Sequence, residues 1–373
     1  VAGVAARPGP LPVPEQAGDP RHHVLDLTAR EARAAHALAA ACAETFKAAD
    51  DPRFLDEAPV IAHELPLAVR RHLNSARRDE NTHATLVRGH LVDQAALGPT
   101  PHHWSTADTG ASQVHGCLLV LYAALLGDIT GWATQQAGRL VTDILPSRGY
   151  EHSLVSASSA RELAWHTEDA FSPHRADWVG LFALRNPGRV PTTVAHIDAR
   201  RVPAAVRAVL AQPRFAARPD TSHEFSADTP AAEPVAVLSG HRDRPVLRID
   251  RDFFTALPGD EEAGRALAWL VAHLDANLTD VLVPTGAVCF LDNRNVVHGR
   301  RPFSAGFDGS DRWLKRVNLV RDLRRTRPGP RAAGEGGPEV RRPRVFGGYR
   351  GALDAAECQG PARTVRGLRA TGT

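Results

Sequence analysis

The sequence of 373 residues contains no methionine and only four cysteines. Cys42, Cys117, Cys289 and Cys358 are widely spaced, with no CxxC pair and no zinc-finger spacing. This spacing predicts incidental thiols in a reducing cytoplasm and argues against a zinc site built from cysteines. Nothing in the sequence explains the missing methionine.

Long apolar runs and a strong net charge are missing as well. No stretch reaches 18 consecutive apolar residues, and the first residues lack the apolar core of a signal peptide, so we expect neither a membrane span nor a secreted protein. The net charge is only +3 and both signs are interspersed, which argues against nucleic-acid binding. The 43% hydrophobic and 23% charged content is typical of a globular protein. No feature indicates an obligate protein partner.

The chain divides into three parts by composition. Residues 1–20 are rich in proline and glycine, which predicts disorder, and residues 326–373 form a tail rich in arginine, glycine and proline. Between them, residues 21–325 are expected to form a single domain. Thr28 and Glu31 have the spacing of a capping box, which predicts a helix to about Lys47. Apolar spacing predicts further helices at residues 65–77, 116–130, 203–210 and 261–277.

From about residue 138 the pattern changes to short runs of alternating or β-branched residues. The predicted strands are residues 139–145, 153–156, 163–168, 179–184, 191–197, 235–238, 246–249, 281–283, 287–291 and 313–320. Turn residues such as Pro284, Thr285 and Gly286 separate them. Many short strands in one span indicate a sandwich or jelly roll, so the fold class is mixed α and β.

His166 and Glu168 are two residues apart, and a strand would place both side chains on one face. An imidazole beside a carboxylate provides two ligands of the 2-His-1-carboxylate triad, which holds non-haem Fe(II) and leaves open positions. His298 is the best candidate for the third ligand. His-x-Glu alone is a weak signal, because a polar, partly exposed strand has the same pattern.

Two further pairs of charged residues share a predicted strand face. Arg312 and Arg316 are four residues apart, and two buried guanidiniums require anions, for which bidentate carboxylates are the natural partners. A surface strand or internal salt bridges would be the alternative. Asp250 and Asp252 could together bind a guanidinium, or belong to an exposed edge strand of alternating charge.

These stretches resemble the clavaminate-synthase-like Fe(II)/2-oxoglutarate oxygenases. The resemblance is carried by WHTEDAFSP at residues 165–173, VHGRR at 297–301 and DRWLKR at 311–316, and it extends over residues 58–323. Within this group the chain is most similar to the arginine oxygenases of the viomycin and streptothricin type. The resemblance implies a double-stranded β-helix core, cupin-like and flanked by helices, with a lid near residues 213–235.

The resemblance also implies a role for each site residue. His166, Glu168 and His298 would bind Fe(II), which acts with O2, and Arg312 would hold the distal carboxylate of 2-oxoglutarate. Thr193 is a further expected 2-oxoglutarate contact, from its place after the metal strand. The residues implied to contact L-arginine are Gln135, Glu168 and Arg316 at the amino-acid end, Asp250 and Asp252 at the guanidinium, Leu154 and Ser156 in the pocket, and Asp220 and Ser222 in the lid.

The implied reaction is hydroxylation of free L-arginine at C3 in specialised-metabolite (antibiotic) biosynthesis. Desaturation between C4 and C5 by the same iron chemistry is the alternative, because the sequence does not resolve which carbon lies at the metal. A zinc hydrolase or a cupin-type isomerase could use the same ligands, but Arg312 argues against both because it requires a dicarboxylate partner. A catalytically inactive arginine-binding protein is the remaining alternative, and the intact triad argues against it.

Overall fold

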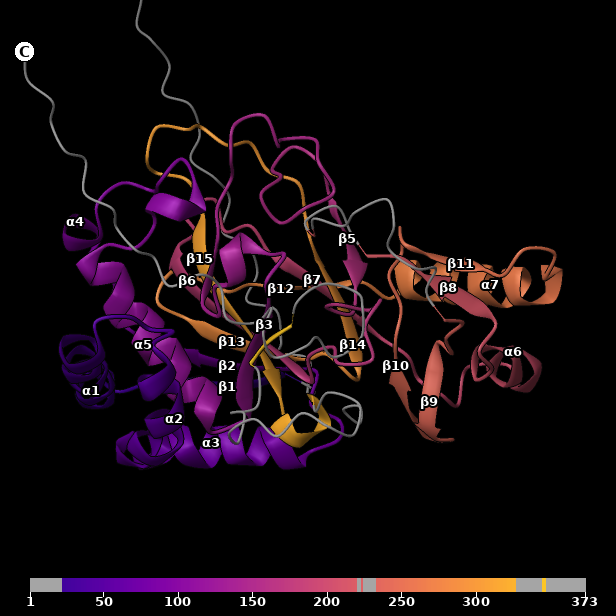
Figure 1. The fold of residues 1–373 in the computed structure, drawn as a ribbon, viewed down its shortest axis with the longest axis horizontal. Helices are drawn as coiled ribbons and strands as arrows, with labels where there is room; N and C mark the ends of the chain where they lie inside the picture. Colours follow the sequence, from indigo (N-terminus) through magenta and orange to yellow (C-terminus); the bar gives the residue numbers. More distant parts are fainter. Residues whose placement is uncertain (1–21, 220–222, 224–232, 327–343, 347–373) are drawn as a thin grey trace, which may run out of the picture.

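Two β-sheets face each other at the centre of the computed structural model, which describes residues 22–219, 223, 233–326 and 344–346 (Figure 1). The larger sheet consists of β1 (His22–Asp26), β2 (Ala84–Arg88), β3 (Asp128–Trp132), β4 (Thr142–Ile144), β6 (Trp178–Arg185), β13 (Val288–Asp292), β15 (Trp313–Val320) and β16 (Val345–Phe346). Its order is β1-β2-β13-β6-β15-β3-β16, with β4 pairing beside this path with β15. All pairs are antiparallel except β1 with β2 and β3 with β16.

The smaller sheet packs against the larger one through an apolar core. It consists of β5 (Leu163–His166), β7 (Thr192–His196), β12 (Thr279–Val281) and β14 (Val296–Arg300), in the order β12-β7-β14-β5. Leu181 and Leu291 of the larger sheet share one buried cluster with Val194 and Val296 of the smaller sheet. Alternating apolar residues thus fill the space between the sheets. This sandwich with helices outside it confirms the predicted fold class.

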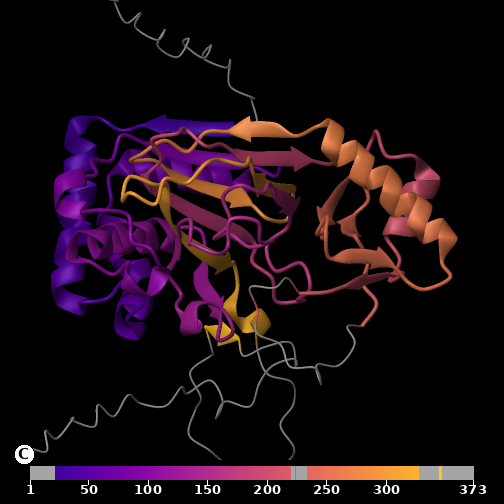
Figure 2. The same ribbon diagram turned by 90° about the horizontal axis from the view of Figure 1, so that it is seen from above.

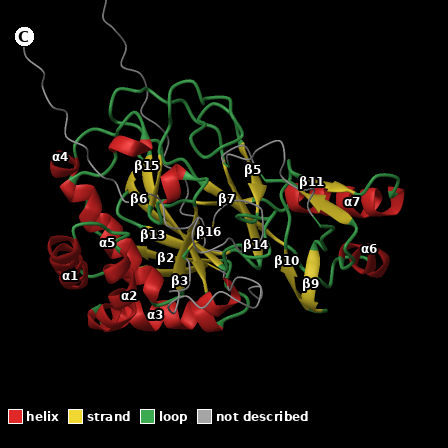
Figure 3. Cartoon of the chain, viewed as in Figure 1, coloured by secondary structure: helices red, strands yellow, loops and turns green. Residues whose placement is uncertain are grey.

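Helices cover the outer face of the larger sheet (Figure 3). They are α1 (Ala29–Phe46), α2 (Pro52–Ile61), α3 (Leu67–Arg78), α4 (Gln94–Leu97) and α5 (Gly110–Ala124). Short 3-10 helices lie at Ala62–Glu64, Trp104–Thr106, Gln136–Gly138 and Leu323–Thr326. The predicted capping box begins α1, since Glu31 N donates to Thr28 Oγ1 and Thr28 N donates to Glu31 Oε2. α5 packs directly on the sheet, where Leu118 and Leu119 share a core with Phe182.

A smaller layer lies on the side of the sheets away from α1–α5 (Figure 2). It contains α6 (Ala204–Leu210), β8 (Phe215–Ala217), β9 (Leu238–His241), β10 (Arg244–Leu247), β11 (Phe254–Ala256) and α7 (Glu261–Ala276). Strand β9 pairs with β10 and β8 pairs with β11. Leu210, Phe215 and Leu270 form part of its own buried cluster. This layer carries the chain that enters and leaves the predicted lid.

Several predictions about elements need correction. Residues 153–156 are not a strand: Ser153 N donates to Tyr150 O and Ser158 N donates to Val155 O, which makes a pair of turns. Residues 344–346 belong to the predicted tail, yet residues 345 and 346 form β16. The predictions for residues 1–20 and for the rest of the tail lie outside the described residues. Within the described part of the chain, no helix is long and apolar enough to cross a membrane.

Candidate active site

One cavity between the two sheets collects most of the predicted site residues. His166, Glu168, His298, Arg312 and Arg316 all line it. The histidines come from the smaller sheet and Arg316 from the larger one. Because both sheets contribute side chains from their facing surfaces, the sandwich itself brings together residues that are far apart in the sequence.

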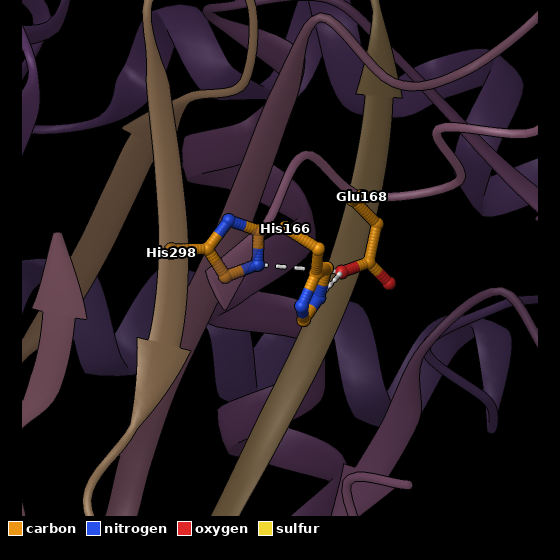
Figure 4. A group of neighbouring side chains, drawn as sticks. All are labelled: His166, Glu168 and His298. Carbon is orange, nitrogen blue, oxygen red and sulfur yellow. Dashed lines mark ion pairs between the residues drawn. The ribbon is translucent and has the colours of Figure 1, made fainter. Parts of the chain in front are cut away.

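The three predicted metal ligands converge on one point (Figure 4). Strands β5 and β14 pair in such a way that His166 lies opposite His298. Glu168 Oε2 lies 3.5 Å from His166 Nε2 and 3.3 Å from His298 Nε2. One potential ligand atom from each residue lies within 4.8 Å of the other two. Among the described residues this is the one such group of three.

The strand predicted for His166 and Glu168 ends earlier than expected. β5 stops at His166, and Glu168 lies in the turn that follows. Asn293 Oδ1 accepts a hydrogen bond of 2.7 Å from Glu168 N, and the Asn293 amide donates back to Glu168 O. Asp169 has a φ of 54° and completes the turn. The side chains therefore meet through a held turn rather than through strand pleating.

The charges at the triad are strongly coupled. Burial alone would raise the pKa of Glu168, but Arg316 and the two histidines hold that pKa well below its usual range. Burial opposes a charge on His166, yet its hydrogen bond to Glu168 and the nearby Asp250 raise its pKa to about 9. Burial and the charge of His166 lower the pKa of His298. These shifts favour the ionised carboxylate of Glu168 and the neutral imidazole of His298, as metal binding requires, whereas His166 would have to give up its proton to a metal.

The two oxygens of Glu168 serve different sides of the cavity. Oε2 faces the histidines, whereas Oε1 accepts a hydrogen bond of 2.6 Å from Arg316 Nη1. Arg316 Nη2 donates to Gln135 Oε1 at 2.7 Å, and Arg316 Nε donates to Thr142 Oγ1 at 3.3 Å. Arg316 thus links the metal ligand to Gln135, and both Arg316 and Gln135 face the cavity.

Among the described residues, Arg312 differs from Arg316 in forming no ion pair with a carboxylate. It is 7% exposed, and its Nε has no hydrogen-bond partner among the described residues. Burial, together with the nearby charge of Arg300, lowers its pKa to about 9. Arg300 is buried as well and donates to Ser158 O, Ser158 Oγ and Arg161 O. Two guanidiniums facing one cavity create a site that attracts an anion.

The predicted contact Thr193 is corrected by the strand register. Thr192 pairs with Arg300 and Thr193 pairs with Gly299, so they lie on opposite faces of the smaller sheet. Thr192 lines the cavity with Arg300 and His298, and Thr193 is not among the lining residues. Of these two threonines, Thr192 is therefore the one that lines the cavity.

The alternation predicted that Asp250 and Asp252 share a strand face, but they do not. Asp250 forms a single β-bridge with His166, and a turn follows in which Asp250 Oδ1 accepts hydrogen bonds from Asp252 N and Phe253 N. Asp250 lines the cavity, whereas Asp252 lines a separate surface hollow beside Arg251. The turn rotates the second carboxylate away from the first.

The remaining predicted positions divide into two groups. Leu154 and Ser156 line the cavity, although they lie on turns. Asp220 and Ser222 lie outside the described residues. The sequence reasoning missed Arg300 and Asn318, whose amide donates to Asp169 Oδ2 at 3.1 Å. The signal for Arg300 was its place two residues after His298, on the same strand face.

Comparison with known proteins agrees with this geometry. The family model for "Taurine catabolism dioxygenase TauD, TfdA family" matches residues 119–318, a range that contains the triad, Arg312 and Arg316. The chain belongs to the TauD/TfdA dioxygenase family. This membership decides against the zinc hydrolase, the cupin-type isomerase and the inactive binding protein.

Within the TauD/TfdA family, the chain is similar to hydroxylases of free amino acids. It is 38% identical over 335 residues to the enduracididine beta-hydroxylase of Streptomyces hygroscopicus, covering 83% of this chain and 97% of that protein. It is 36% identical over 330 residues to the L-ornithine/L-arginine 3-hydroxylase of Catenulispora acidiphila, covering 82% and 96%. The crystal structure of the non-heme iron oxygenase OrfP with Fe, succinate and (3S)-hydroxy-L-Arg is 39% identical, with a TM-score of 0.77, covering 81% of this chain and 96% of that chain. OrfP has also been crystallised with Fe and alpha-ketoglutaric acid.

Proposed function

We propose that this protein is an Fe(II)- and 2-oxoglutarate-dependent dioxygenase that hydroxylates free L-arginine at C3. The observation that carries the proposal is the combination, in one cavity, of the His166–Glu168–His298 group and the buried guanidinium of Arg312, which forms no ion pair with the described residues. A 2-His-1-carboxylate group is the donor set of non-haem iron. A guanidinium with no protein counter-ion nearby suits a cosubstrate that brings its own carboxylate.

The donor atoms fit Fe(II). Two imidazole Nε2 atoms and one carboxylate oxygen meet at a buried point, and the facial triad leaves positions open for other ligands. Glu168 is oriented by Arg316 through its other oxygen, which is the kind of support that holds a metal-binding carboxylate in place. A bound Fe(II) would supply the chemistry by which O2 and 2-oxoglutarate generate the oxidant that removes hydrogen from the substrate.

Arg312, with Thr192 and Arg300 beside it, would bind the distal carboxylate of 2-oxoglutarate. The carboxylate would offset the desolvation that lowers the pKa of Arg312. OrfP, at 40% identity, binds alpha-ketoglutaric acid together with Fe, which supports this use of the cavity.

L-Arginine would enter with its amino-acid end at Arg316, Gln135 and Glu168. Arg316 would meet the α-carboxylate, and the oxygens of Gln135 and Glu168 would accept hydrogen bonds from the α-amino group. The guanidinium would then pair with Asp250, which lines the same cavity. A role for Asp252 stays a prediction, and the proposal rests on Asp250.

The contact between Arg316 and Glu168 also favours C3 as the reacting carbon. Arg316 Nη1 lies 2.6 Å from a carboxylate whose other oxygen faces the metal point, so a bound α-carboxylate is anchored beside that point. The carbons nearest the anchor must then lie nearest the metal, and C3 is the first carbon beyond the α-carbon. The (3S)-hydroxy-L-Arg bound to OrfP and the 3-hydroxylase relative support the same position.

The decisive experiment is turnover with a panel of free amino acids. The protein is incubated with Fe(II), 2-oxoglutarate, O2 and L-arginine, L-enduracididine, L-ornithine, L-lysine or L-asparagine, and succinate and product are quantified. We expect L-arginine to gain one oxygen, with one succinate formed per product and NMR placing the hydroxyl at C3. A loss of two hydrogens would instead show desaturation. Turnover of L-asparagine without L-arginine would contradict the assignment of Asp250.

We also propose that the protein acts in the cytoplasm, as part of specialised metabolism. The three described cysteines, Cys42, Cys117 and Cys289, are buried and unpaired, which suits a reducing compartment. The enduracididine beta-hydroxylase of Streptomyces hygroscopicus is a relative that acts on an unusual amino acid, which supports the second part.

A further inference from the structure

Strand β16, near the end of the chain, extends the larger sheet next to a segment that reaches the active site. It pairs in parallel with β3: Gly131 N donates to Arg344 O at 2.9 Å, and Ala133 N donates to Phe346 O at 2.6 Å. Figure 3 shows β16 in the centre of the molecule, close to β3. Without β16, this edge of the sheet would end at β3, and those two N–H groups would lose their partners.

Two side chains fasten β16 to the body of the protein. Arg344 forms ion pairs with Asp128 at 3.2 Å and with Asp56 at 3.5 Å. The ring of Phe346 is 9% exposed and contacts Trp132 at a centroid distance of 5.0 Å and His174 at 5.5 Å. The segment is therefore docked by charge at one end and by an aromatic anchor at the other.

The aromatic anchor leads directly to the cavity wall. Trp132 contacts Phe171 at a centroid distance of 5.1 Å, and Phe171 lines the cavity. His223 lies edge-on to both of these rings, at 5.5 Å from Trp132 and 4.9 Å from Phe171. Phe346 thus forms the outer layer of an aromatic stack whose inner layer faces the substrate space.

The backbone of β3 leads to the same part of the cavity. Three residues after Trp132 the chain reaches Gln135, whose N donates to Trp132 O and whose side chain holds Arg316. The next two residues, Gln136 and Ala137, have φ values of 44° and 56°, a left-handed conformation that L-residues avoid. A strained turn of this kind persists only where its surroundings hold it. The Gln136 side chain fixes the turn by two hydrogen bonds with the backbone of Asp143. The pairing of β16 with β3 fixes the strand that leads into the turn.

We propose that residues 344–346 are a positioning element of the active site, which holds Gln135 and Phe171 in place at the amino-acid end of the substrate. For the identity of that substrate, the proposal rests on the proposed function. The contacts of β16 lead through β3 and Trp132 of the larger sheet, whereas Thr192 and Arg300, which would bind 2-oxoglutarate with Arg312, belong to the smaller sheet. Loss of the element should therefore weaken binding of the amino acid and leave the 2-oxoglutarate requirement unchanged.

The first test uses point variants of the full chain. We expect Phe346→Ala to raise the KM for L-arginine about threefold to tenfold, the range that the loss of an aromatic contact supports. The KM for 2-oxoglutarate should stay within about twofold, and Phe346→Leu should restore most of the loss because it refills the site. Arg324→Ala, which removes an exposed arginine bonded to Asp322, is the matched control and should behave as wild type. If Phe346→Ala instead lowers kcat and leaves the KM values for L-arginine and 2-oxoglutarate unchanged, the role of Phe346 is merely structural and the proposal is overturned.

The second test does not depend on turnover. Hydrogen–deuterium exchange of residues 128–135 is compared in the full chain, in a chain ending after residue 350 and in a chain ending after residue 326. We expect the amides of Gly131 and Ala133 to lose protection only when residues 344–346 are absent. Unchanged exchange in the shortest chain would refute the docking of β16. If the full chain fails to hydroxylate L-arginine, the proposed function fails, whereas the exchange result still decides whether the element exists.

Discussion

Replacing Arg312 with methionine should make the ligand-free protein more stable while abolishing the response to 2-oxoglutarate. Arg312 is 7% exposed and forms no ion pair within the described residues. Its charge therefore opposes folding until an anion arrives. Methionine has a similar length and fills irregular space without a charge.

The size of the effect follows from the buried charge. Burial and the charge of Arg300 lower the pKa of Arg312 from its usual range to about 9. At 1.36 kcal/mol for each pH unit, this depression corresponds to roughly 5 kcal/mol as an upper bound. Replacing buried charges by apolar side chains in other proteins has gained about 1–4 kcal/mol, so we expect a gain in that range. The folded chain would lose the proton only above about pH 9, and the unfolded chain only at a much higher pH, so stability would rise with pH only in the alkaline range above about pH 9. Between pH 6 and 8 the difference should be constant.

Arg316→Met provides the matched comparison, because Arg316 lines the same cavity but is paired. Its removal leaves Glu168 buried without the 2.6 Å bond to Nη1. Breaking a buried ion pair from one side costs about 3–5 kcal/mol, and the two histidines that remain beside Glu168 should keep the loss near the lower value. The two substitutions should therefore shift stability in opposite directions.

The assay is thermal unfolding of each protein, first with EDTA and then with Mn(II) and 2-oxoglutarate in the absence of turnover. Wild-type protein at 100 times its dissociation constant for 2-oxoglutarate should gain about 2.7 kcal/mol, and Arg312→Met should gain none. On addition of 2-oxoglutarate, the stability difference between these two proteins should therefore shift by about 2.7 kcal/mol in favour of the wild type. A less stable Arg312→Met protein in EDTA, or one that still responds to 2-oxoglutarate, would refute the reasoning.

Three further predictions concern the metal, the substrate and the backbone. Because the pKa of His166 is raised to about 9 in the metal-free protein, metal binding must displace its proton, so metal affinity should tighten about tenfold per pH unit from pH 6 to 8; calorimetry that finds no pH dependence would contradict this. Asp250→Asn should raise the KM for L-arginine about tenfold or more, and Asp252→Asn should raise it less, because of these two residues only Asp250 lines the cavity. Equal effects on KM in steady-state kinetics would show that the turn between Asp250 and Asp252 is misplaced. A Cβ on Gly299 would lie 2.5 Å from Leu163 O, so Gly299→Ala should push β14 away from β5 and lower the metal content of the purified protein, and full metal content would argue against it.

The sequence by itself determined the features that depend on regular spacing. The alternation over residues 313–320 predicts a strand, and β15 has these bounds. The capping box at Thr28 and Glu31 predicts the start of α1. Arg312 and Arg316, which line one cavity, could be paired from the sequence because an extended chain repeats every two residues. The distant His298 followed from the ligand chemistry of non-haem iron, which requires a second histidine.

Only the tertiary structure decided where the regular strand spacing ends and which residues of neighbouring strands lie opposite each other. Glu168 reaches the histidines because Asn293, far along the chain, holds a turn after β5. A turn likewise separates Asp250 from Asp252, and the register of β7 on β14 brings Thr192 rather than Thr193 into the cavity. For Glu168 and Thr192, hydrogen bonds between distant segments set the side-chain direction, and a local pattern carries no information about such a partner. The docking of β16 on β3 has the same origin: two residues cannot form a strand alone, and only the open edge of a completed sheet gives them a place to bind.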